Sequence, residues 1–572
     1  MFLPTTKNEL VKLGWERLDV IIISGDTYID TSYSGAAIIG KVLLNAGYKV
    51  GIIAQPDIYN DKDITRLGEP KLFWGVTSGC VDSMVANYTA TKKPRRQDDF
   101  TPGGVNNKRP DRATIVYSNL IRKYFKNTVP IVLGGIEASL RRIAHYDYWD
   151  DKIRRSILFD SKADYLVYGM GEKATLEIAM NLQNKLQYNL ENFEGLQNIR
   201  SICYISKNAR KNYIPLPSFE EVIIDKEKFI EMFHIFYRNN DPITGKGLYQ
   251  KHGDRYLIQN PPANYLTQEE IDNIYNLDFE RNVHPYYKKD GEVRALRTIR
   301  YSITTHRGCY GECNFCSITI HQGTNIISRS QKSIIKEVES ITKIPEFKGI
   351  INDIGGPTAN MYATGCEKMQ LHGKCLTKDC LFPTTCKKIN NNHNPQIELL
   401  RILRKIKGIK KVFVASGIRY DMIIDDNMAG VRYLEELIEH HISGQLKVAP
   451  EHTELKVLNL MRKPSVQYLE KFKNQFNIIN KHKKKDQYLT YYLIAAHPGC
   501  NYNDEMKMKR YISNELKIHP EQVQIFTPTP STYSTLMYYT EMNPWTGGKL
   551  FVEKNLGEKE KHKRAITNKS PR

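Results

Sequence analysis

The amino-acid sequence predicts an α/β protein in which an N-terminal doubly wound domain is followed by a partial (β/α)6 barrel. Short β-branched runs alternate with amphipathic helical patterns in both halves of the chain, as in parallel sheets whose strands are connected by helices. The length of 572 residues also exceeds the size at which one hydrophobic core keeps growing. We therefore expect more than one domain.

The N-terminal domain, residues 1–185, begins with a strand, a helix and a second strand. Residues 19–24 are a β-branched run, residues 35–47 have the apolar spacing of a helix closed by glycine, and residues 49–54 follow as a strand. This order predicts a right-handed unit with parallel strands. Further strands are expected at residues 72–76, 114–117, 130–133 and 164–168.

Ligands of such a sheet bind at the carboxyl ends of its strands. Four residues fall at these ends or in the loops after them: Asp26, Ser78, Cys80 and Glu137. Each is a candidate for a binding pocket, and each has an equally good interpretation as a turn former or helix cap. The alternatives stay open at this point.

Two other parts of the chain lack regular patterns. Residues 186–295 mix aromatic and charged residues with proline pairs, which predicts a connector or small insertion. Residues 549–572 form a basic tail that we expect to be disordered.

The second domain, residues 296–548, carries six further strand patterns with helical patterns between them. These strands are expected at residues 301–305, 349–356, 411–416, 445–450, 491–496 and 522–527. Six such units predict a partial TIM-type barrel, whose chemistry takes place at the carboxyl ends of its strands.

Directly after the first of these strands comes a C-x3-C-x2-C triplet, Cys309, Cys313 and Cys316. Three thiolates at this spacing can hold three irons of a four-iron cluster and leave the fourth iron open to a cofactor. The alternative is a zinc site in which His306 or His321 supplies the fourth ligand.

A second set of cysteines, Cys366, Cys375, Cys380 and Cys386, follows the second strand of the barrel. Four thiolates could hold an auxiliary iron-sulfur cluster or a zinc ion, or could coexist without metal. By the same strand-end rule, this loop belongs to the face on which chemistry is expected.

Composition limits the location and the partners of the protein. Seven of the ten cysteines lie between residues 309 and 386, which indicates metal ligation in a reducing compartment. No apolar stretch approaches the ~20 residues of a membrane span, and the first residues do not resemble a secretory signal. We expect a cytoplasmic protein without membrane contact. Its formal charge of +20 makes nucleic acid one candidate partner.

With Phe315 just before its last sulfur, the triplet resembles the cluster-binding loop of the radical S-adenosylmethionine (radical SAM) enzymes. This resemblance implies a 4Fe–4S cluster, S-adenosylmethionine as cofactor, and a 5'-deoxyadenosyl radical that abstracts a hydrogen atom from the substrate. It makes Cys309, Cys313 and Cys316 the catalytic residues. The reductant would be a protein such as flavodoxin or ferredoxin.

The resemblance also implies a cofactor site at the strand ends. Gly355 and Gly356 resemble the start of the Gly-Gly-Glu motif, although Pro357 replaces the acid. The guanidinium of Arg419 suits a carboxylate, and Glu451 is the candidate for the ribose hydroxyls. The implied cofactor-binding residues are Phe315, Gly355, Gly356, Ser416, Arg419, Glu451 and Gly499.

Residues 132–135 and 167–172 of the N-terminal domain resemble the cobalamin-binding type of domain found ahead of many radical SAM cores. The histidine-ligating form carries D-x-H-x-x-G, whereas residues 30–35 have Ser32 in the histidine position. No imidazole is available there to ligate cobalt. We therefore expect no cobalamin, although binding without a protein ligand is left open.

Residues 25–26, 52–56, 355–362 and 526–530, together with the second cysteine set, resemble the YgiQ-type radical SAM proteins over nearly the whole chain. The function predicted is reductive cleavage of S-adenosylmethionine, with a small-molecule or macromolecular substrate that the resemblance does not identify. One alternative is a methylthiotransferase-like modification of tRNA or protein. An alternative of another class is a zinc-bound, non-catalytic nucleic-acid-binding protein.

Overall fold

The computed structural model describes residues 1–188, 195–520 and 522–567. The chain forms two compact units. The N-terminal unit comprises Met1–Tyr265 and Asn273–Arg300, and the C-terminal unit comprises Leu266–Asp272 and Tyr301–Arg572. Among the described helices, none combines the length and the apolar character that a membrane crossing requires.

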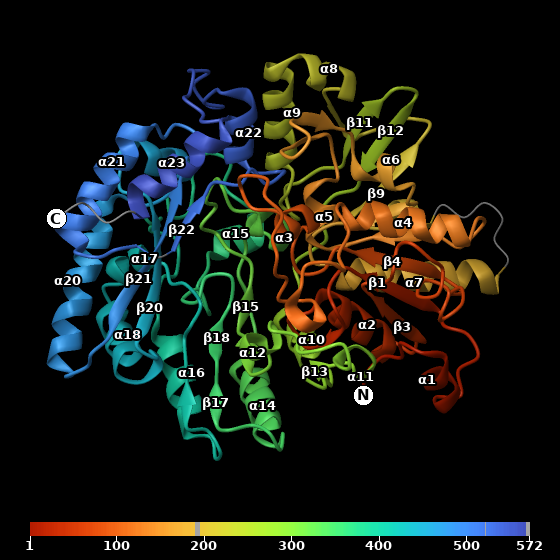
Figure 1. The fold of residues 1–572 in the computed structure, drawn as a ribbon, viewed down its shortest axis with the longest axis horizontal. Helices are drawn as coiled ribbons and strands as arrows, with labels where there is room; N and C mark the ends of the chain where they lie inside the picture. The colour runs from red at the N-terminus through yellow and green to blue at the C-terminus, as the bar shows by residue number, and fades with distance from the viewer. Residues whose placement is uncertain (189–194, 521, 568–572) are drawn as a thin grey trace. The chain divides into compact units, whose positions relative to one another are not determined.

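The N-terminal unit is built on a nine-stranded sheet in which the five strands from β8 to the β3 edge are parallel (Figure 1). In spatial order these strands are β3 (Val50–Ala54), β1 (Val20–Ser24), β4 (Phe73–Thr77), β5 (Ile131–Leu133) and β8 (Tyr165–Val167). The strand order reverses at β1, which makes the region between β1 and β4 the topological switch point. The predicted α/β class with a large parallel sheet is confirmed.

These strands are apolar because both faces of the sheet are covered. Every residue of β1 and β3 is buried, as expected for parallel strands packed between helices. Val20 and Ile22 share a hydrophobic core with α2 (Gly35–Asn45) and α7 (Glu172–Gln187). Helix α4 (Ala113–Tyr124) lies on the other side of the strands in Figure 1.

The predicted strand at residues 114–117 is wrong, because these residues form the first turn of α4. Thr114 donates from its backbone nitrogen to Glu137 Oε1 at 3.1 Å, and Ala113 donates to Ser83 Oγ at 3.1 Å. These distant side chains satisfy the backbone donors of the first turn, which a helix leaves unpaired. Tertiary contacts thus overcome the β-branched composition of this segment.

The interpretation of residues 186–295 as a connector is also wrong for much of its length. Four strands from it extend the sheet beyond β8: β9 (Ile202–Ser206), β12 (Arg255–Gln259), β11 (Leu248–His252) and β10 (Ile214–Leu216). Strands β11 and β12 form a hairpin in which His252 pairs with Arg255, and Gly253 in the turn has φ +62°. A two-residue turn with glycine at positive φ is typical of hairpins.

In the C-terminal unit, strands occur at all six predicted positions. They are β14 (Ser302–Thr304), β17 (Ile350–Ile351) with β18 (Asp353–Gly355), β19 (Lys411–Val412), β20 (Gln445–Glu451), β21 (Tyr488–Ala495) and β22 (Gln522–Ile525). Each pairs in parallel with the next along the chain, and a bridge between Ile418 and Val448 connects the third to the fourth. This is the pairing order that a partial barrel requires, and the barrel itself stays a prediction.

Helices between these strands bury one face each. Examples are α14 (Gln331–Thr342), α16 (Asn394–Lys405) and α20 (Val466–His482), whose apolar residues share one core with the strands. Pro395 occupies the first turn of α16, where proline lacks only a hydrogen bond that the helix would not have made.

The tail is not disordered where the structure describes it. Residues Leu556–Thr567 form α23, which buries Lys559, His562, Ala565 and Ile566. This spacing marks one face of a helix, but the many charges around it obscured the pattern. The rest of the predicted disordered tail, residues 568–572, lies outside the described residues.

We expect the substitution Ile566→Ala to lower the free energy of unfolding of the C-terminal unit by about 2–4 kcal/mol, because it removes a side chain from the core. Arg564→Ala is the matched control, since Arg564 is exposed on the same helix. Denaturant titration of the two variants tests this, and equal stabilities would contradict a packed α23.

Candidate functional site

The cysteine triplet lies in a loop that follows β14, the first strand of the C-terminal unit. A short hairpin of β15 (His306–Arg307) and β16 (Ile327–Ser328) frames the loop. Gly308 has φ +86°, and a side-chain carbon there would collide with the carbonyl oxygen of Asn325. Cys309 donates from its backbone nitrogen to the oxygen of Gly323 at 3.1 Å. Only glycine at position 308 therefore lets the loop begin where it does.

The centre of the loop is fixed to α19 (Leu455–Met461) by Asn314. The backbone nitrogen of Asn314 donates to the oxygen of Met461 at 3.0 Å, and its side-chain amide donates to the oxygen of Leu460 at 2.7 Å. These bonds satisfy carbonyl groups at the end of a helix. The loop is thereby held against the element that follows β20.

Two of the three thiols, Cys309 and Cys313, lie beside Gly311 and Arg419. A side-chain carbon on Gly311 would lie 3.3 Å from Cys309 Sγ and 4.0 Å from Cys313 Sγ. Burial raises the pKa of Cys309, and it raises the pKa of Cys316 to about 12. The thiolates therefore need added positive charge, which a bound metal would supply.

The geometry does not fit a single zinc ion. A tetrahedral zinc draws its sulfurs to roughly 3.8 Å from one another, given Zn–S bonds of about 2.3 Å. Across the described ranges, three or more ligand atoms within 4.8 Å of one another occur at His452, Cys500 and Glu505, and not at the triplet. The ring of His306 is buried against Gly356 and bonded to Thr305 Oγ1 at 2.9 Å. A multi-iron cluster, which spaces its thiolates more widely, fits better.

Arg419 faces the triplet, but its guanidinium does not offer a free pair of nitrogen donors to a ligand. Its Nε and Nη2 donate to the carboxylate of Asp421 at 2.8 and 2.5 Å, and its Nη1 donates to Cys313 Sγ at 3.5 Å. Asn360 holds its backbone on both sides, accepting from the nitrogen and donating to the oxygen of Arg419. The donors expected for a cofactor carboxylate are thus directed at Asp421 and a cluster thiol.

Glu451 ends β20 beside Cys316. Its backbone has φ +69°, and the pairing of β20 with β21 shifts register just before it. Burial raises the pKa of Glu451, while the charges of Lys463 and Arg419 oppose the rise. A strained backbone at a strand end is typical of a functional position. The predicted contact of Glu451 with a ribose remains a prediction.

The strand ends that carry Gly355, Gly356 and Ser416 are joined by Asp353. Asp353 Oδ1 accepts from the backbone nitrogens of Ala415 and Ser416 at 2.7 and 3.1 Å, and its other oxygen accepts from Ser416 Oγ. A side-chain carbon on Gly356 would lie 2.6 Å from the ring of His306. The glycine at 356 is therefore explained by packing within the protein.

Packing within the protein also accounts for Gly499 and Phe315. Gly499 has φ +86°, a side-chain carbon there would collide with Leu460, and its nitrogen donates to the oxygen of Phe551 at 2.7 Å. Phe315 packs against a small cluster of Val457, Met461 and Cys500. Neither contact tests whether these residues also touch a cofactor.

Three members of the second cysteine set lie together beside the first. Cys366, Cys380 and Cys386 pack in one cluster with Tyr310 and Cys309, and Cys375 is not part of it. Lys374 forms an ion pair with Glu312 of the first loop, and Arg462 forms one with Asp379 at 3.2 Å. The two cysteine loops are thus held to each other.

A buried carboxylate that the sequence did not reveal lies behind the site. Glu505 Oε1 is 3.3 Å from Cys500 Sγ, 3.3 Å from His562 Nδ1 and 2.7 Å from the nitrogen of Ala496. His452 Nδ1 accepts from the nitrogen of Glu454, so in the neutral ring the proton is on Nε2, facing Glu505 at 3.7 Å. A metal at Nε2 would require that position free. We interpret the group as a hydrogen-bonded carboxylate.

The strand-end candidates of the N-terminal unit have structural partners. Asp26 accepts from Arg109 Nη2 at 2.5 Å and from the nitrogen of Cys80 at 2.6 Å. Ser78 Oγ donates to the oxygen of Val81 at 3.0 Å. Glu137 is buried and accepts from the backbone nitrogens of Ser83 and Thr114. These contacts support the interpretation as turn formers and caps.

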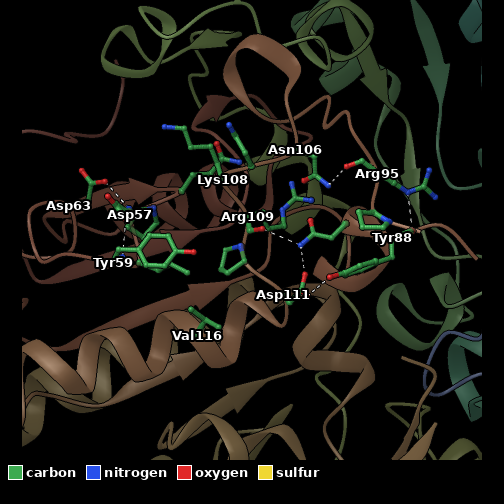
Figure 2. A pocket seen from close by; sticks show the side chains of 17 residues that line it. Asp57, Tyr59, Asp63, Tyr88, Arg95, Asn106, Lys108, Arg109, Asp111 and Val116 are labelled. Atoms are coloured by element: carbon green, nitrogen blue, oxygen red, sulfur yellow. Dashed lines mark hydrogen bonds between the residues drawn. The ribbon is translucent and has the colours of Figure 1, made fainter. Parts of the chain in front are cut away.

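The same edge of this sheet holds a cavity of about 760 Å³ beyond the end of β3. Figure 2 shows Arg109 and Asp111 at the middle of its lining, with Tyr59 and Tyr88 on either side. Asp111 accepts from Tyr88 at 2.7 Å and from the amide of Asn87 at 2.8 Å. The wall carries charges of both signs. Ser32, in the position of a cobalt-ligating histidine, is buried and offers a hydroxyl group instead.

Comparisons with known proteins agree with the sequence motifs. A family model described as Radical SAM N-terminal matches residues 2–302. The UPF0313 protein FN0734 of Fusobacterium nucleatum is 61% identical over 569 residues, with 99% of each chain covered. The UPF0313 protein of Thermotoga maritima is 49% identical over 566 residues, with 99% of this chain and 98% of its own covered.

Two solved structures have distant similarity. The radical S-adenosylmethionine methyltransferase TsrM of Kitasatospora setae, with cobalamin and a 4Fe–4S cluster bound, has a TM-score of 0.48 at 12% identity, covering 90% of this chain and 76% of its own. The cobalamin-dependent enzyme OxsB has a TM-score of 0.49 at 11% identity, covering 92% and 56%. Similarity of this degree says nothing about the ligands of this chain.

The buried carboxylate predicts a pH dependence of stability. Burial raises the pKa of Glu505, but hydrogen bonds from His452 and His562 outweigh it and lower the pKa to about 2. The ionised form therefore stabilises the fold above pH 4.5, and this contribution is lost as the pH falls toward 2. We expect Glu505→Gln to lower the free energy of unfolding by roughly 3 kcal/mol at pH 7, and less at pH 3.

Denaturant titration at both pH values measures this difference. Glu558→Gln is the matched control, because Glu558 is partly exposed and pairs with Lys561 along its own helix. A deficit of Glu505→Gln that stayed constant between pH 7 and pH 3 would contradict the assignment.

Proposed function

Because the chain belongs to the UPF0313 family, the YgiQ-type radical SAM proteins, we propose that it binds a 4Fe–4S cluster and reductively cleaves S-adenosylmethionine at it. Cys309, Cys313 and Cys316 would hold the cluster. The observation that carries this proposal is the set of three half-buried thiols in the loop at the carboxyl end of the first parallel strand, two of them beside Gly311. When bound, the cluster supplies the electron that cleaves the cofactor.

The residues of the chain have three tasks around such a cluster. Gly308 and Asn314 hold the backbone of the loop in place. Thr358 Oγ1 lies 3.5 Å from Cys309 Sγ, and Arg419 Nη1 lies 3.5 Å from Cys313 Sγ. Hydrogen bonds to cluster sulfurs raise the reduction potential. Glu451, beside Cys316, is placed to accept from hydroxyl groups of the cofactor.

Other parts of the proposal follow from the family and from the residues. The deoxyadenosyl radical would abstract hydrogen from a substrate that neither identifies. We place the reaction in the cytoplasm with a flavodoxin or ferredoxin as electron donor, since all ten cysteines are free thiols. Buried Ser32 supplies no imidazole, so we propose no cobalt ligand from this position.

The central prediction concerns cofactor cleavage. Anaerobically reconstituted protein should form 5'-deoxyadenosine from S-adenosylmethionine only when a low-potential reductant is added. The variant with Cys309, Cys313 and Cys316 all replaced by alanine should form none, because it cannot hold the cluster. Chromatography of the product measures both, and deoxyadenosine from the triple variant would refute the proposal.

Arg419 should set the reduction potential of the cluster. Arg419→Gln removes a positive charge and a donor from Cys313, so the oxidised form gains relative stability and the midpoint potential becomes more negative. Redox titration followed by electron paramagnetic resonance measures the shift.

The control for that titration is Arg401→Gln, which breaks an ion pair with Glu436 that lies away from the cysteines. It should leave the potential unchanged. A midpoint potential in Arg419→Gln equal to that of the control would show that Arg419 does not act on the cluster.

A further inference from the structure

We propose that Cys366, Cys380 and Cys386 hold a second four-iron cluster beside the first, and that Cys375 is not a ligand. The evidence for the second site is its own contacts. Only its role beside a first cluster rests on the proposed function. Spacing along the chain does not distinguish among the four cysteines of this set. The structure separates them.

The three thiols are brought together by the loop that follows α15 (Glu367–His372). Cys366 precedes this helix as its N-cap residue, and the backbone nitrogen of Cys386 donates to the oxygen of Cys380 at 2.8 Å, which closes a turn. Cys380 is buried, and Cys366 and Cys386 pack against the same cluster. Cys375 instead precedes the exposed stretch of residues 376–378.

The loop itself argues for a bound group. Residues 373–393, between α15 and α16, contain no helix and no strand. Irregular loops of this length inside a compact unit are uncommon, and they are usually functional. Its anchoring ion pairs, Lys374 with Glu312 and Arg462 with Asp379, fix the positions around the thiols. A cluster ligated by Cys380 and Cys386 of this loop, and by Cys366 before α15, would order the remainder.

The arrangement favours a multi-iron cluster over zinc. The three sulfurs are not among the described groups whose ligand atoms all lie within 4.8 Å of one another, as a single tetrahedral ion would need. Their surroundings are soft and apolar, with Met361, Met369 and Met422 in the same cluster. Three thiolates suit a four-iron cluster with one iron open to an exogenous ligand.

One side chain lies between the two sites. Tyr310 follows Cys309 in the first loop, yet its buried ring packs in the same cluster as Cys380. Its hydroxyl donates to Thr364 Oγ1 at 2.8 Å and lies 3.9 Å from Met422 Sδ. Cys309 also packs against this cluster. The two sets of sulfur ligands are therefore neighbours.

The test measures iron at the second site in a variant that lacks the cysteines of the first. We expect full-length protein with Cys309, Cys313 and Cys316 replaced by alanine to retain, after anaerobic reconstitution, about half of the iron and inorganic sulfide of the unaltered chain. Adding Cys380→Ala should abolish this iron. Adding Cys375→Ala, the matched control, should leave it unchanged, together with the paramagnetic resonance signal of the reduced cluster.

Each other outcome overturns the inference. Zinc without iron in the triple variant, or the absence of both metals, would exclude the second cluster. Iron loss on adding Cys375→Ala would show that the site uses four cysteines. Cys366→Ser, at a half-buried position, repeats the test if Cys380→Ala fails to fold by circular dichroism. Deoxyadenosine from the unaltered chain alongside an iron-free triple variant would reject this inference while the proposed function stands. Iron in the triple variant without deoxyadenosine from the unaltered chain would reject the proposed function while this inference stands.

Discussion

The packing of the cysteine triplet in one loop, with Cys309 and Cys313 beside Gly311, is the constraint on which the C-terminal unit depends. A thiolate in an apolar environment is costly, and burial raises the pKa of Cys309 and Cys316 accordingly. The loop is nevertheless fixed at its start by Gly308 and at its centre by Asn314. A loop held this firmly in a form that disfavours free thiolates is organised for a cation that bonds to sulfur.

Parallel pairing explains how residues far apart in the chain meet at this loop. The carboxyl ends of β14, β18, β19, β20 and β21 face one edge, and each delivers a short segment there. Asp353 connects two of these ends, and Asn360 connects the second segment to Arg419. The strands themselves are plain apolar runs. Function is concentrated in the few residues that follow each of them.

This division explains what the sequence could predict. Strands buried on both faces have a local signature, so the five parallel strands of the N-terminal unit and the strands of the C-terminal unit were located, whereas β9 to β12 were not. The spacing of Cys309, Cys313 and Cys316 predicted a metal site, which stays a prediction. The capping of α4 by Glu137 and the bond of His562 to Glu505 depend on contacts between distant segments. No local pattern reports such contacts. For the same reason, spacing could not separate Cys375 from the other three cysteines of its set.

The charges nearest the triplet decide what kind of group it can hold. Arg419 is the cation in contact with a thiol, but Asp421 binds two of its nitrogens and offsets its charge. Glu451 beside Cys316 is opposed by Lys463. The protein therefore supplies almost no net positive charge against three thiolates. A nucleophilic cysteine would need such charge from the protein, whereas a metal cluster brings its own, so the charge balance favours metal ligation over covalent catalysis by a thiolate.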